Sequence, residues 1–406
     1  MTLLRLLAAF LLLAAFAGGC TDAAQPVDEY VGAPGVSDTE IVLGSSLALS
    51  GHAGYLGTQT LRGAQACLRA VNESGGIHGR TIRIETRDDA YDPPRCLANT
   101  QQFIIGGDVF ALFCYVGTPT TVKVLPMLED GRTPLVGMFT GANALREPFN
   151  RYVVNVRASY YQETESAVAH LVNNLGLKRI AVFYQYDAYG FDGLVGTELA
   201  LKRYELEPVA RGSYTRGTLD VEEGLERIAA SDAEAVVMVG TYSACAEFIR
   251  RSSAQGFDPI FYNVSFVGAE ELARRLAPLE GRRVVMSQVV PPLTGQAAPG
   301  GGEDVVTEYL DALGRYFPGE PPSFAGLEGF LNARILVEGL RRTGPEPTRE
   351  RFLDAIESIR DLDLGRGTTV TFGPMDHQGM DYVSFTRLEG GRFRPLEDWS
   401  VLKERP

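Results

Sequence analysis

Short apolar runs alternate with segments of helical periodicity along most of the chain, and this alternation is what most constrains its fold. Residues 109–116, 179–184 and 235–240 are almost uninterrupted apolar runs, as expected for strands of a parallel sheet that helices cover on both faces. Helical spacing of apolar residues follows the last two runs, at 193–204 and 243–255. Repeated strand–helix units predict an α/β fold built on doubly wound parallel sheets.

The units occur in two successive series, so we expect two doubly wound lobes. The first series has predicted strands at 40–44, 81–86, 109–116 and 133–139 and helices at 61–71 and 93–105. The second has predicted helices at 159–175, 193–204, 221–230 and 243–255 and strands at 179–184, 235–240, 259–264 and 283–288. After a Pro/Gly-rich loop come predicted helices at 305–316, 323–342 and 348–359, a strand at 368–372 and an antiparallel meander at 381–396.

The amino terminus has the pattern of an export signal. Arg5 is followed by the apolar run Leu6 to Phe16, which is shorter than the ~20 residues that a membrane span needs, so residues 1–19 are predicted to be a signal peptide. The sequence Ala17-Gly18-Gly19-Cys20 resembles a bacterial lipobox, which implies cleavage before Cys20 and lipidation of its thiol. The alternative is an ordinary signal peptide with a chance cysteine. Residues 20–36 are predicted to form the lipidated cysteine and a flexible tether.

Composition excludes some partners. The chain has 38 Lys and Arg against 51 Asp and Glu, a formal charge of −13, and no basic run, so we expect no nucleic-acid binding. No later segment approaches 18 uninterrupted apolar residues. We therefore expect contact with the membrane through the lipid anchor alone, and a location that is exported, periplasmic or otherwise extracytoplasmic.

The remaining cysteines leave two interpretations open. Cys67, Cys96, Cys114 and Cys245 match no zinc-binding spacing. Cys96 opens a predicted helix and Cys114 lies in the strand that follows, so those two could meet in a disulfide in an oxidising compartment. Four buried thiols are the equally open alternative.

The sequence offers no constellation for catalysis or for a cofactor. Asp88, Asp89 and Asp92 are better explained as residues that cap the helix at Pro93 than as metal ligands. No paired histidines at ligand spacing and no Gly-x-Ser-x-Gly motif occur. We expect neither an enzyme, nor a metal site, nor a cofactor.

The loops that follow the predicted strands suit ligand binding. In open α/β sheets ligands bind beyond the carboxyl ends of the strands. The loops at 45–57, 115–121, 139–145, 184–190 and 240–244 all contain small hydroxyl residues, glycines or tyrosines. Glycine lets the backbone approach a ligand, helix-start N–H groups attract an anion, and tyrosine supplies a flat wall with a polar tip.

Six segments in order carry a resemblance to a known family. They are Leu49-Ser50-Gly51 with Gly57, residues 71–80 (VNESGGIHGR), 87–93 (RDDAYDP), 116–120 (VGTPT), 187–190 (DAYG) and 264–269 (VSFVGA). The chain resembles the solute-binding proteins of branched-chain amino acid and amide ABC transporters, which have the type I periplasmic binding fold. That resemblance implies two lobes, 37–157 plus 287–365 and 158–286 plus 366–406, joined by a three-strand hinge and closing over a ligand.

The resemblance also implies a set of ligand-binding residues. Thr118 stands where a hydroxyl holds the ligand carboxylate, Thr140 and Gly141 lie on a loop that adds a backbone contact, and the second lobe contributes aromatic residues. The full expected set is Ser50, Gly117, Thr118, Thr140, Gly141, Tyr189, Tyr242 and Ser265. Glu328 is expected either to reach the cleft or to be a solvated acid in the first turn of its helix.

Two positions depart from the pattern of the amino-acid binders. Ala142 replaces a threonine, and Ser265 stands where a glutamate faces the ligand ammonium. A buried ammonium without a counter-charge costs several kcal/mol. We therefore expect a ligand that is neutral, carries only a carboxylate, or is larger and apolar.

The expected function is the capture of a small organic solute and its delivery to an ABC permease by a monomeric lipoprotein. Lobe closure would be the mechanism, because a ligand that bridges both lobes favours the closed state. The alternative is a sensory or carrier protein of the same fold that binds an apolar, aromatic or lipid ligand without a permease.

Overall fold

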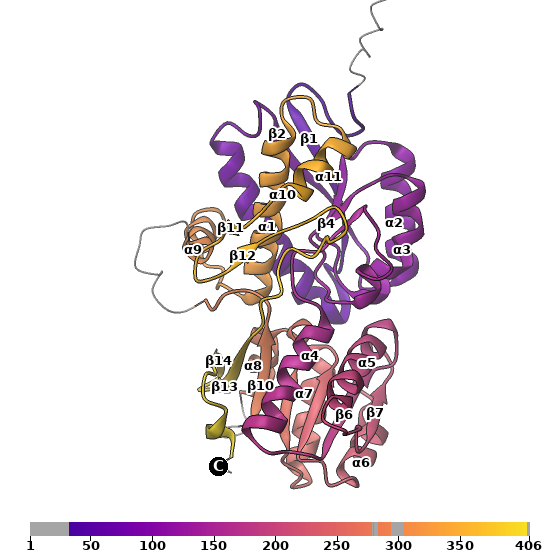
Figure 1. The fold of residues 1–406 in the computed structure, drawn as a ribbon, viewed down its shortest axis with the longest axis vertical. Coiled ribbons are helices and arrows are strands. Elements are labelled where there is room, and N and C mark those ends of the chain that lie inside the picture. The colour runs from indigo at the N-terminus through magenta and orange to yellow at the C-terminus, as the bar shows by residue number, and fades with distance from the viewer. Residues whose placement is uncertain (1–31, 278, 280–282, 294–303, 404–406) are drawn as a thin grey trace, which may run out of the picture. The chain divides into compact units, whose positions relative to one another are not determined.

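The computed structural model describes residues 32–277, 279, 283–293 and 304–403 (Figure 1). The predicted signal peptide, Cys20 and most of the tether lie outside the described residues. Within the described part of the chain, no helix is long and apolar enough to cross a membrane.

The first sheet is entirely parallel. Its strand order is β2 (Thr81–Asp88), β1 (Glu40–Leu47), β3 (Ala111–Phe113), β4 (Leu135–Val136), β5 (Val153–Val154). Helices α2 (Pro93–Gly106) and α3 (Thr118–Asp130) pack on one face, and α1 (Gly54–Glu73), α10 (Phe324–Thr343) and α11 (Arg349–Glu357) on the other. Helix α9 (Val305–Tyr316) packs against α1. Successive strand residues point to opposite faces, and Val42 and Leu43 of β1 accordingly enter different cores.

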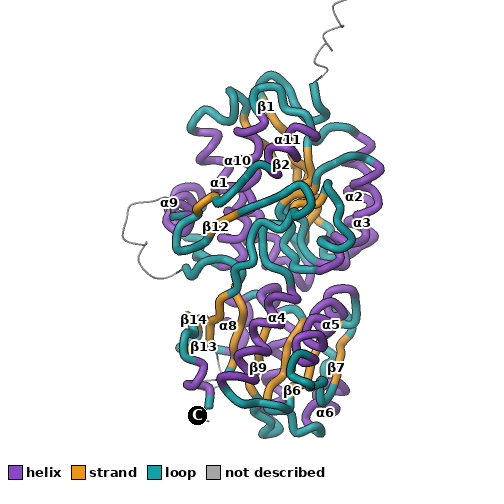
Figure 2. Tube along the Cα trace, viewed as in Figure 1, coloured by secondary structure: helices purple, strands orange, loops and turns teal. Residues whose placement is uncertain are grey.

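The second sheet has the same winding with an antiparallel addition. The parallel strands run in the order β7 (Arg211–Tyr214), β6 (Ile180–Gln185), β8 (Ala235–Val239), β9 (Ile260–Asn263), β10 (Val284–Gln288). The antiparallel hairpin β13 (Ser384–Glu389) and β14 (Arg392–Pro395) continues from β10. The helices of this part are α4 (Tyr160–Ala169), α5 (Ala188–Lys202), α6 (Glu222–Ala229), α7 (Tyr242–Ala254) and α8 (Ala269–Leu276). Figure 2 shows helices on both faces of these strands.

The chain passes between the two sheets three times, after β5, after β10 and before β13. The predicted α/β architecture with two doubly wound sheets is thereby confirmed. The lobe boundaries stay a prediction. The third passage contains a small antiparallel ribbon formed by β11 (Leu362–Asp363) and β12 (Thr369–Val370). Val370 and Phe372 pack in the core around α10 and α11.

Several elements were absent from the sequence-based expectation. Helix α3 has a proline at its start and Pro126 inside it, which masked its helical pattern. Helix α8 carries Glu270 and Glu271 in its first turn and Arg274 and Arg275 in its last. This distribution of charges is typical of a helix, but the sequence-based expectation did not use it. The short strands β5 and β7 have too few residues for a clear alternation.

The disulfide that the sequence left open is not formed. Cys67, Cys96, Cys114 and Cys245 are all buried free thiols. Cys96 packs in the core beneath α2, while Cys114 packs in the core on the opposite face of the sheet, with its sulfur 4.0 Å from the side-chain nitrogen of Asn332. A disulfide needs sulfur atoms about 2 Å apart, which these opposite faces preclude.

Candidate ligand-binding site

Both sheets have a point where the winding of the chain reverses. It lies between β1 and β3 in the first sheet and between β6 and β8 in the second. Ligands of open α/β sheets bind beyond the carboxyl ends of strands at such points. The residues after β1, β3, β6 and β8 are therefore the place to look for a site, and they include five of the eight residues expected from the sequence.

Two predicted residues meet directly. The Oγ1 atoms of Thr118, at the start of α3, and Thr140, after β4, lie 2.7 Å apart in a hydrogen bond, and both side chains are buried. Each hydroxyl has further acceptor capacity. The backbone N–H of Ala142 also points at Thr140 Oγ1, at 3.4 Å. The structure thus brings two of the eight expected residues into direct contact.

The two predicted glycines admit aromatic rings. Gly117 has φ +96°, and a Cβ there would lie 2.0 Å from the ring of Tyr91. A Cβ on Gly141 would lie 2.8 Å from the backbone nitrogen of Tyr160. The glycines therefore let these two tyrosines approach the strand ends. No ligand is needed to explain their glycine identity.

Five aromatic side chains form what we call the aromatic cluster: Tyr91, Phe139, Tyr160, Tyr189 and Phe266. The ring of Phe266, in the turn after β9, lies 4.8 Å from that of Tyr189, 5.6 Å from that of Phe139 and 5.9 Å from that of Tyr91. All five are at most 3% exposed. Residues from both sheets thus meet and fill the space beyond the strand ends.

Tyr189 is a member of the aromatic cluster, but its hydroxyl is engaged. It donates a hydrogen bond of 3.1 Å to the carbonyl of Gly240, after β8. The hydroxyl of Tyr160, in contrast, is buried without a hydrogen-bond partner of normal geometry among the described residues. The Thr140 hydroxyl nevertheless lies close enough to act on the pKa of Tyr160, against the larger effect of burial. Tyr160 therefore stands beside the threonine pair, and its hydroxyl has more capacity left for a ligand than that of Tyr189.

Ser265 contacts a buried ionic cluster. Its backbone N–H donates to Glu163 Oε2 at 2.8 Å and its hydroxyl to Glu163 Oε1 at 3.0 Å. Arg157, on the segment that leaves β5, pairs with Glu163 at 2.5 Å and donates to the Ser265 hydroxyl. The Arg157 guanidinium also lies 5.4 Å from the Tyr160 ring centre and 5.8 Å from that of Phe139, within the range of a cation–π contact.

Glu328 completes this cluster and is not a solvated acid. Its Oε1 lies 3.3 Å from Nη1 of Arg157, and its residue is 4% exposed. Burial raises the pKa of Glu328 to about 7, against the opposing effect of Arg157. Burial also works against the charge of Arg157, but Glu328 and Glu163 outweigh it and raise the pKa of that guanidinium. A permanent internal cation therefore stands beside Ser265.

Two predicted residues lie apart from the threonine pair. Ser50 is exposed and donates its hydroxyl to Asp88 Oδ2 at 2.5 Å. Tyr242 packs edge-on against Tyr55 at 6.2 Å, with the guanidinium of Arg275 5.2 Å from its ring centre. No hydrogen bond or ring contact joins either residue to Thr118 or Thr140 in the part of the chain that the structure describes.

Sequence reasoning missed Tyr91, Phe266 and Arg157. A signal existed for Tyr91, which follows β2 at the same edge of the sheet, and for Phe266, which follows Ser265. Arg157 stands within the apolar stretch VVNVRAS, where an arginine needs a buried partner.

As to metals, residues 32–277, 279, 283–293 and 304–403 contain no group of three His, Cys, Asp or Glu side chains that could hold an ion.

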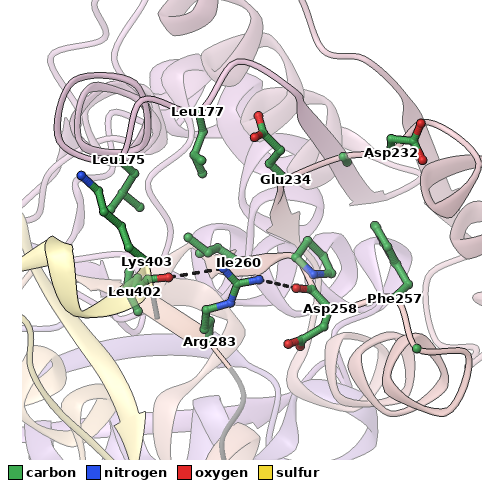
Figure 3. Close-up of a pocket in the computed structure, with 13 residues that line it drawn as sticks. Leu175, Leu177, Asp232, Glu234, Phe257, Asp258, Ile260, Arg283, Leu402 and Lys403 are labelled. Atoms are coloured by element: carbon green, nitrogen blue, oxygen red, sulfur yellow. Dashed lines mark hydrogen bonds between the residues drawn. The ribbon is translucent and has the colours of Figure 1, made fainter. Parts of the chain in front are cut away.

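A cavity of about 460 Å³ in the second sheet is not part of this site. Its lining includes Leu177, Glu234, Ile260 and Arg283 (Figure 3). These residues lie at or before the amino ends of β6, β8, β9 and β10. The cavity therefore lies at the amino ends of the strands. Ligands of open α/β sheets bind at the opposite edge, beyond the carboxyl ends, where the winding reverses.

Two doubly wound sheets, connected by three passages of the chain and meeting at their winding reversals, define the architecture of bilobal periplasmic binding proteins. The chain belongs to the periplasmic binding protein family, whose model matches residues 40–392. Members of this family bind small ligands outside the cytoplasm and work with ABC transporters.

Individual relatives agree with this assignment. A crystal structure from Rhodopirellula baltica, described as a possible leucine/isoleucine/valine-binding protein, is 35% identical, with a TM-score of 0.83 over 91% of this chain and 98% of that one. A fatty acid ABC transporter substrate-binding protein from Thermomonospora curvata shares the fold at 20% identity, with a TM-score of 0.82 over 94% and 98%. An amino acid binding protein of Pseudomonas aeruginosa is 24% identical over 58% of this chain and 63% of its own length.

Proposed function

We propose that this protein captures a small organic acid without an ammonium group, in the space between the two winding reversals, and delivers it to an ABC permease. The hydroxyl pair of Thr118 and Thr140 would hold the ligand carboxylate. The aromatic cluster would enclose the apolar remainder. Ser50, Gly117, Gly141, Tyr189, Tyr242 and Ser265 remain proposed members of the site's wall.

The observation that carries the proposal is the internal cation at Ser265. Arg157 occupies the hydrogen-bonding capacity of Ser265 and Glu163. Arg157 already pairs with Glu163 and Glu328. A ligand ammonium here would therefore find no free carboxylate as a counter-charge and would meet the like charge of the guanidinium, which costs several kcal/mol. A ligand that places an uncharged group here avoids this cost.

The aromatic cluster supports an apolar body for the ligand. Phe266 from the second sheet touches Tyr91 and Phe139 from the first, so a ligand must part these rings to enter and would then lie among them. Aromatic faces bury much apolar area. The Thermomonospora protein, described as a fatty acid ABC transporter substrate-binding protein, illustrates that the fold accommodates an acid without an ammonium.

Lobe closure would distinguish the ligand-bound protein from the free protein. A ligand that contacts residues of both sheets binds the closed arrangement more tightly than the open one, and it shifts the equilibrium by that difference in affinity. Lipidation of Cys20, which the lipobox-like sequence predicts, would keep the protein near a permease in the membrane.

The test compares acids with their amino counterparts on a soluble chain that begins at Thr21. Thermal unfolding is measured with leucine against 4-methylpentanoate, valine against 3-methylbutanoate, and phenylalanine against phenylpropionate. A ligand at 100 times its Kd adds ~2.7 kcal/mol to the free energy of unfolding, which raises Tm by several degrees. Stabilisation by one of the acids but not by its amino partner supports the proposal. Stabilisation by leucine or valine contradicts it. Delivery is tested separately, by asking whether the lipidated chain pulls down a permease from the membrane.

A further inference from the structure

A second cavity lies beside the passages that connect the two sheets. Its volume is about 540 Å³, within the range of small-molecule sites. Its walls come from three segments far apart in the sequence: the loop 143–150, the first passage with the start of α4, and the turn 375–378 of the third passage. It shares none of its lining with the Thr118–Thr140 pair or the aromatic cluster.

Arg146 places a positive charge in this cavity. Its Nε donates to Gln378 Oε1 at 2.6 Å, and its Nη1 and Nη2 donate to the carbonyls of Ala142 and Arg157, each at 2.8 Å. None of these acceptors is a carboxylate, and further guanidinium N–H groups stay without a partner among the described residues. Burial, and then the charge of Arg157, lower the pKa of Arg146, although Asp192 acts in the opposite direction from beyond ion-pair distance.

Asn155 supplies a second unsatisfied group. Its side-chain nitrogen donates to the carbonyl of Leu145 at 2.9 Å, and its backbone is bonded to the third passage through His377 and Gly379. Its Oδ1 is buried and has no hydrogen-bond partner in the part of the chain that the structure describes, and the residue is 3% exposed. A buried acceptor left unpaired costs about 1–3 kcal/mol, so this atom favours a ligand with a hydrogen-bond donor.

The rest of the lining sets the character of the ligand. Amide side chains of Asn143, Asn150 and Gln162 also line the cavity. The oxygens of Asn150 and Gln162 already accept hydrogen bonds within the protein, so these two amides offer their nitrogens as donors. Glu147 and Asp376 are exposed members of the wall. Their charges disfavour a ligand with several carboxylates, whereas hydroxyl groups match the amides well.

We propose that this cavity, which we call the hinge site, binds a small polyhydroxylated monocarboxylic acid, with the carboxylate on Arg146 and hydroxyls on Asn155 and the neighbouring amides. A guanidinium without a carboxylate partner, beside a buried acceptor without a donor, is the arrangement that such an acid satisfies at both ends. The inference does not rest on the proposed function, because the hinge site and the threonine pair have separate walls.

The experiment uses gluconate as the probe, with sorbitol as its uncharged analogue and hexanoate as an acid without hydroxyls. Hydrogen exchange of the purified protein is followed by mass spectrometry while each compound is titrated. Gluconate is expected to slow exchange in peptides that cover 142–159 and 375–379, with an apparent affinity at least about tenfold above that of sorbitol or hexanoate at the same peptides. No protection of these peptides by gluconate overturns the proposal, as does equal protection by all three compounds.

Variants locate the site independently. Arg146→Gln is expected to reduce gluconate affinity at least about tenfold, whereas Arg132→Gln, at an exposed position outside the cavity, leaves it unchanged. Gluconate protection of peptides that cover 48–57 or 117–121 in place of the hinge peptides would mean that the acid binds at the strand ends and would overturn the proposal. Because Arg146→Gln could unfold the chain, the wild-type exchange pattern decides the matter without it.

Discussion

Arg157 and Glu328 form a buried ion pair, 3.3 Å between Nη1 and Oε1, that joins the segment leaving β5 to helix α10. Glu163, on α4, holds the same guanidinium from the side of the second sheet. The side chains are at most 5% exposed. One cation therefore ties together elements on both sides of the candidate site.

Removal of this cation should destabilise the fold strongly. Arg157→Met leaves Glu163 and Glu328 buried without their partner, and breaking a buried pair in this way costs about 3–5 kcal/mol. Urea denaturation measures the loss. Arg203→Met is the matched control, because Arg203 pairs with Glu165 at an exposed position, where a pair contributes less than about 1 kcal/mol. Equal losses in both variants would contradict the role given to Arg157.

Glu328 should make stability depend on pH. Its pKa in the folded protein, about 7, lies above its ordinary value near 4.5, so the folded state holds the proton more tightly than the unfolded chain does. Between these two values, the free energy of unfolding should fall as pH rises, by at most about 1.4 kcal/mol per pH unit for this one group. Denaturation at several pH values should give a shallower dependence for Glu328→Gln than for the wild type. Glu207→Gln, at an exposed position, should keep the wild-type slope.

The hydroxyl pair should matter for binding more than for stability. Thr118→Val removes the bond to Thr140 and the proposed hold on the ligand carboxylate, for an expected 10- to 100-fold loss of affinity, roughly 1.5–3 kcal/mol. Calorimetry with the acid found in the thermal screen measures it. Thr121→Val is the control, since its hydroxyl donates to the carbonyl of Gly117, the residue that precedes the same helix. A control variant that loses as much affinity would show that the effect is not specific to the pair.

Gly117 should be intolerant of a side chain because of Tyr91. Gly117→Ala puts a Cβ 2.0 Å from the Tyr91 ring at φ +96°, whereas Gly75→Ala has φ +98° and open space around it. The second variant should cost about 1–2 kcal/mol from backbone strain alone, and the first about 1–3 kcal/mol more from the clash. When Gly117→Ala is combined with Tyr91→Ala, the loss of stability that Gly117→Ala shows beyond Gly75→Ala should disappear, as measured by thermal unfolding. An unchanged excess in the double variant would mean that the ring is not its source.

The cysteines should be unreactive in the native protein. Burial raises the pKa of Cys67 to about 12 and raises those of Cys96, Cys114 and Cys245 as well. A thiol reagent added to the chain that begins at Thr21 should label none of the four thiols before unfolding and all of them afterwards. Labelling of only two after unfolding would show that the other two are joined in a disulfide and would contradict the prediction.

Much of the fold was predictable because its signals are local. The apolar runs at 179–184 and 235–240 became β6 and β8 within a residue of the predicted bounds, since continuous apolar runs suit strands that are covered on both faces. Helix α3 was missed because the prolines that open and interrupt it hide a helical pattern. The hairpin of β13 and β14, which turns at Gly390-Gly391, lies within the meander that the sequence predicts, but its pairing with β10 is a long-range contact.

The candidate site was predictable only in part. Thr118 and Thr140 follow strands that pair in one sheet, so their proximity could be expected from the order of the loops. Tyr242 also follows a strand end, yet its ring turns toward Tyr55. Which way a side chain turns at a strand end depends on the neighbours that the packing of helices supplies.

The sequence by itself determined the alternation of strands and helices, the doubly wound sheets and the loops that carry small hydroxyl residues, because each depends on residues close together in the chain. The tertiary structure decided which buried ionised groups pair with each other. Arg157 and Glu328 are separated by 171 positions, and nothing local to either residue specifies the other. They pair because the packing of α10 against the first sheet brings both out of water, where an ionised group needs a counter-charge.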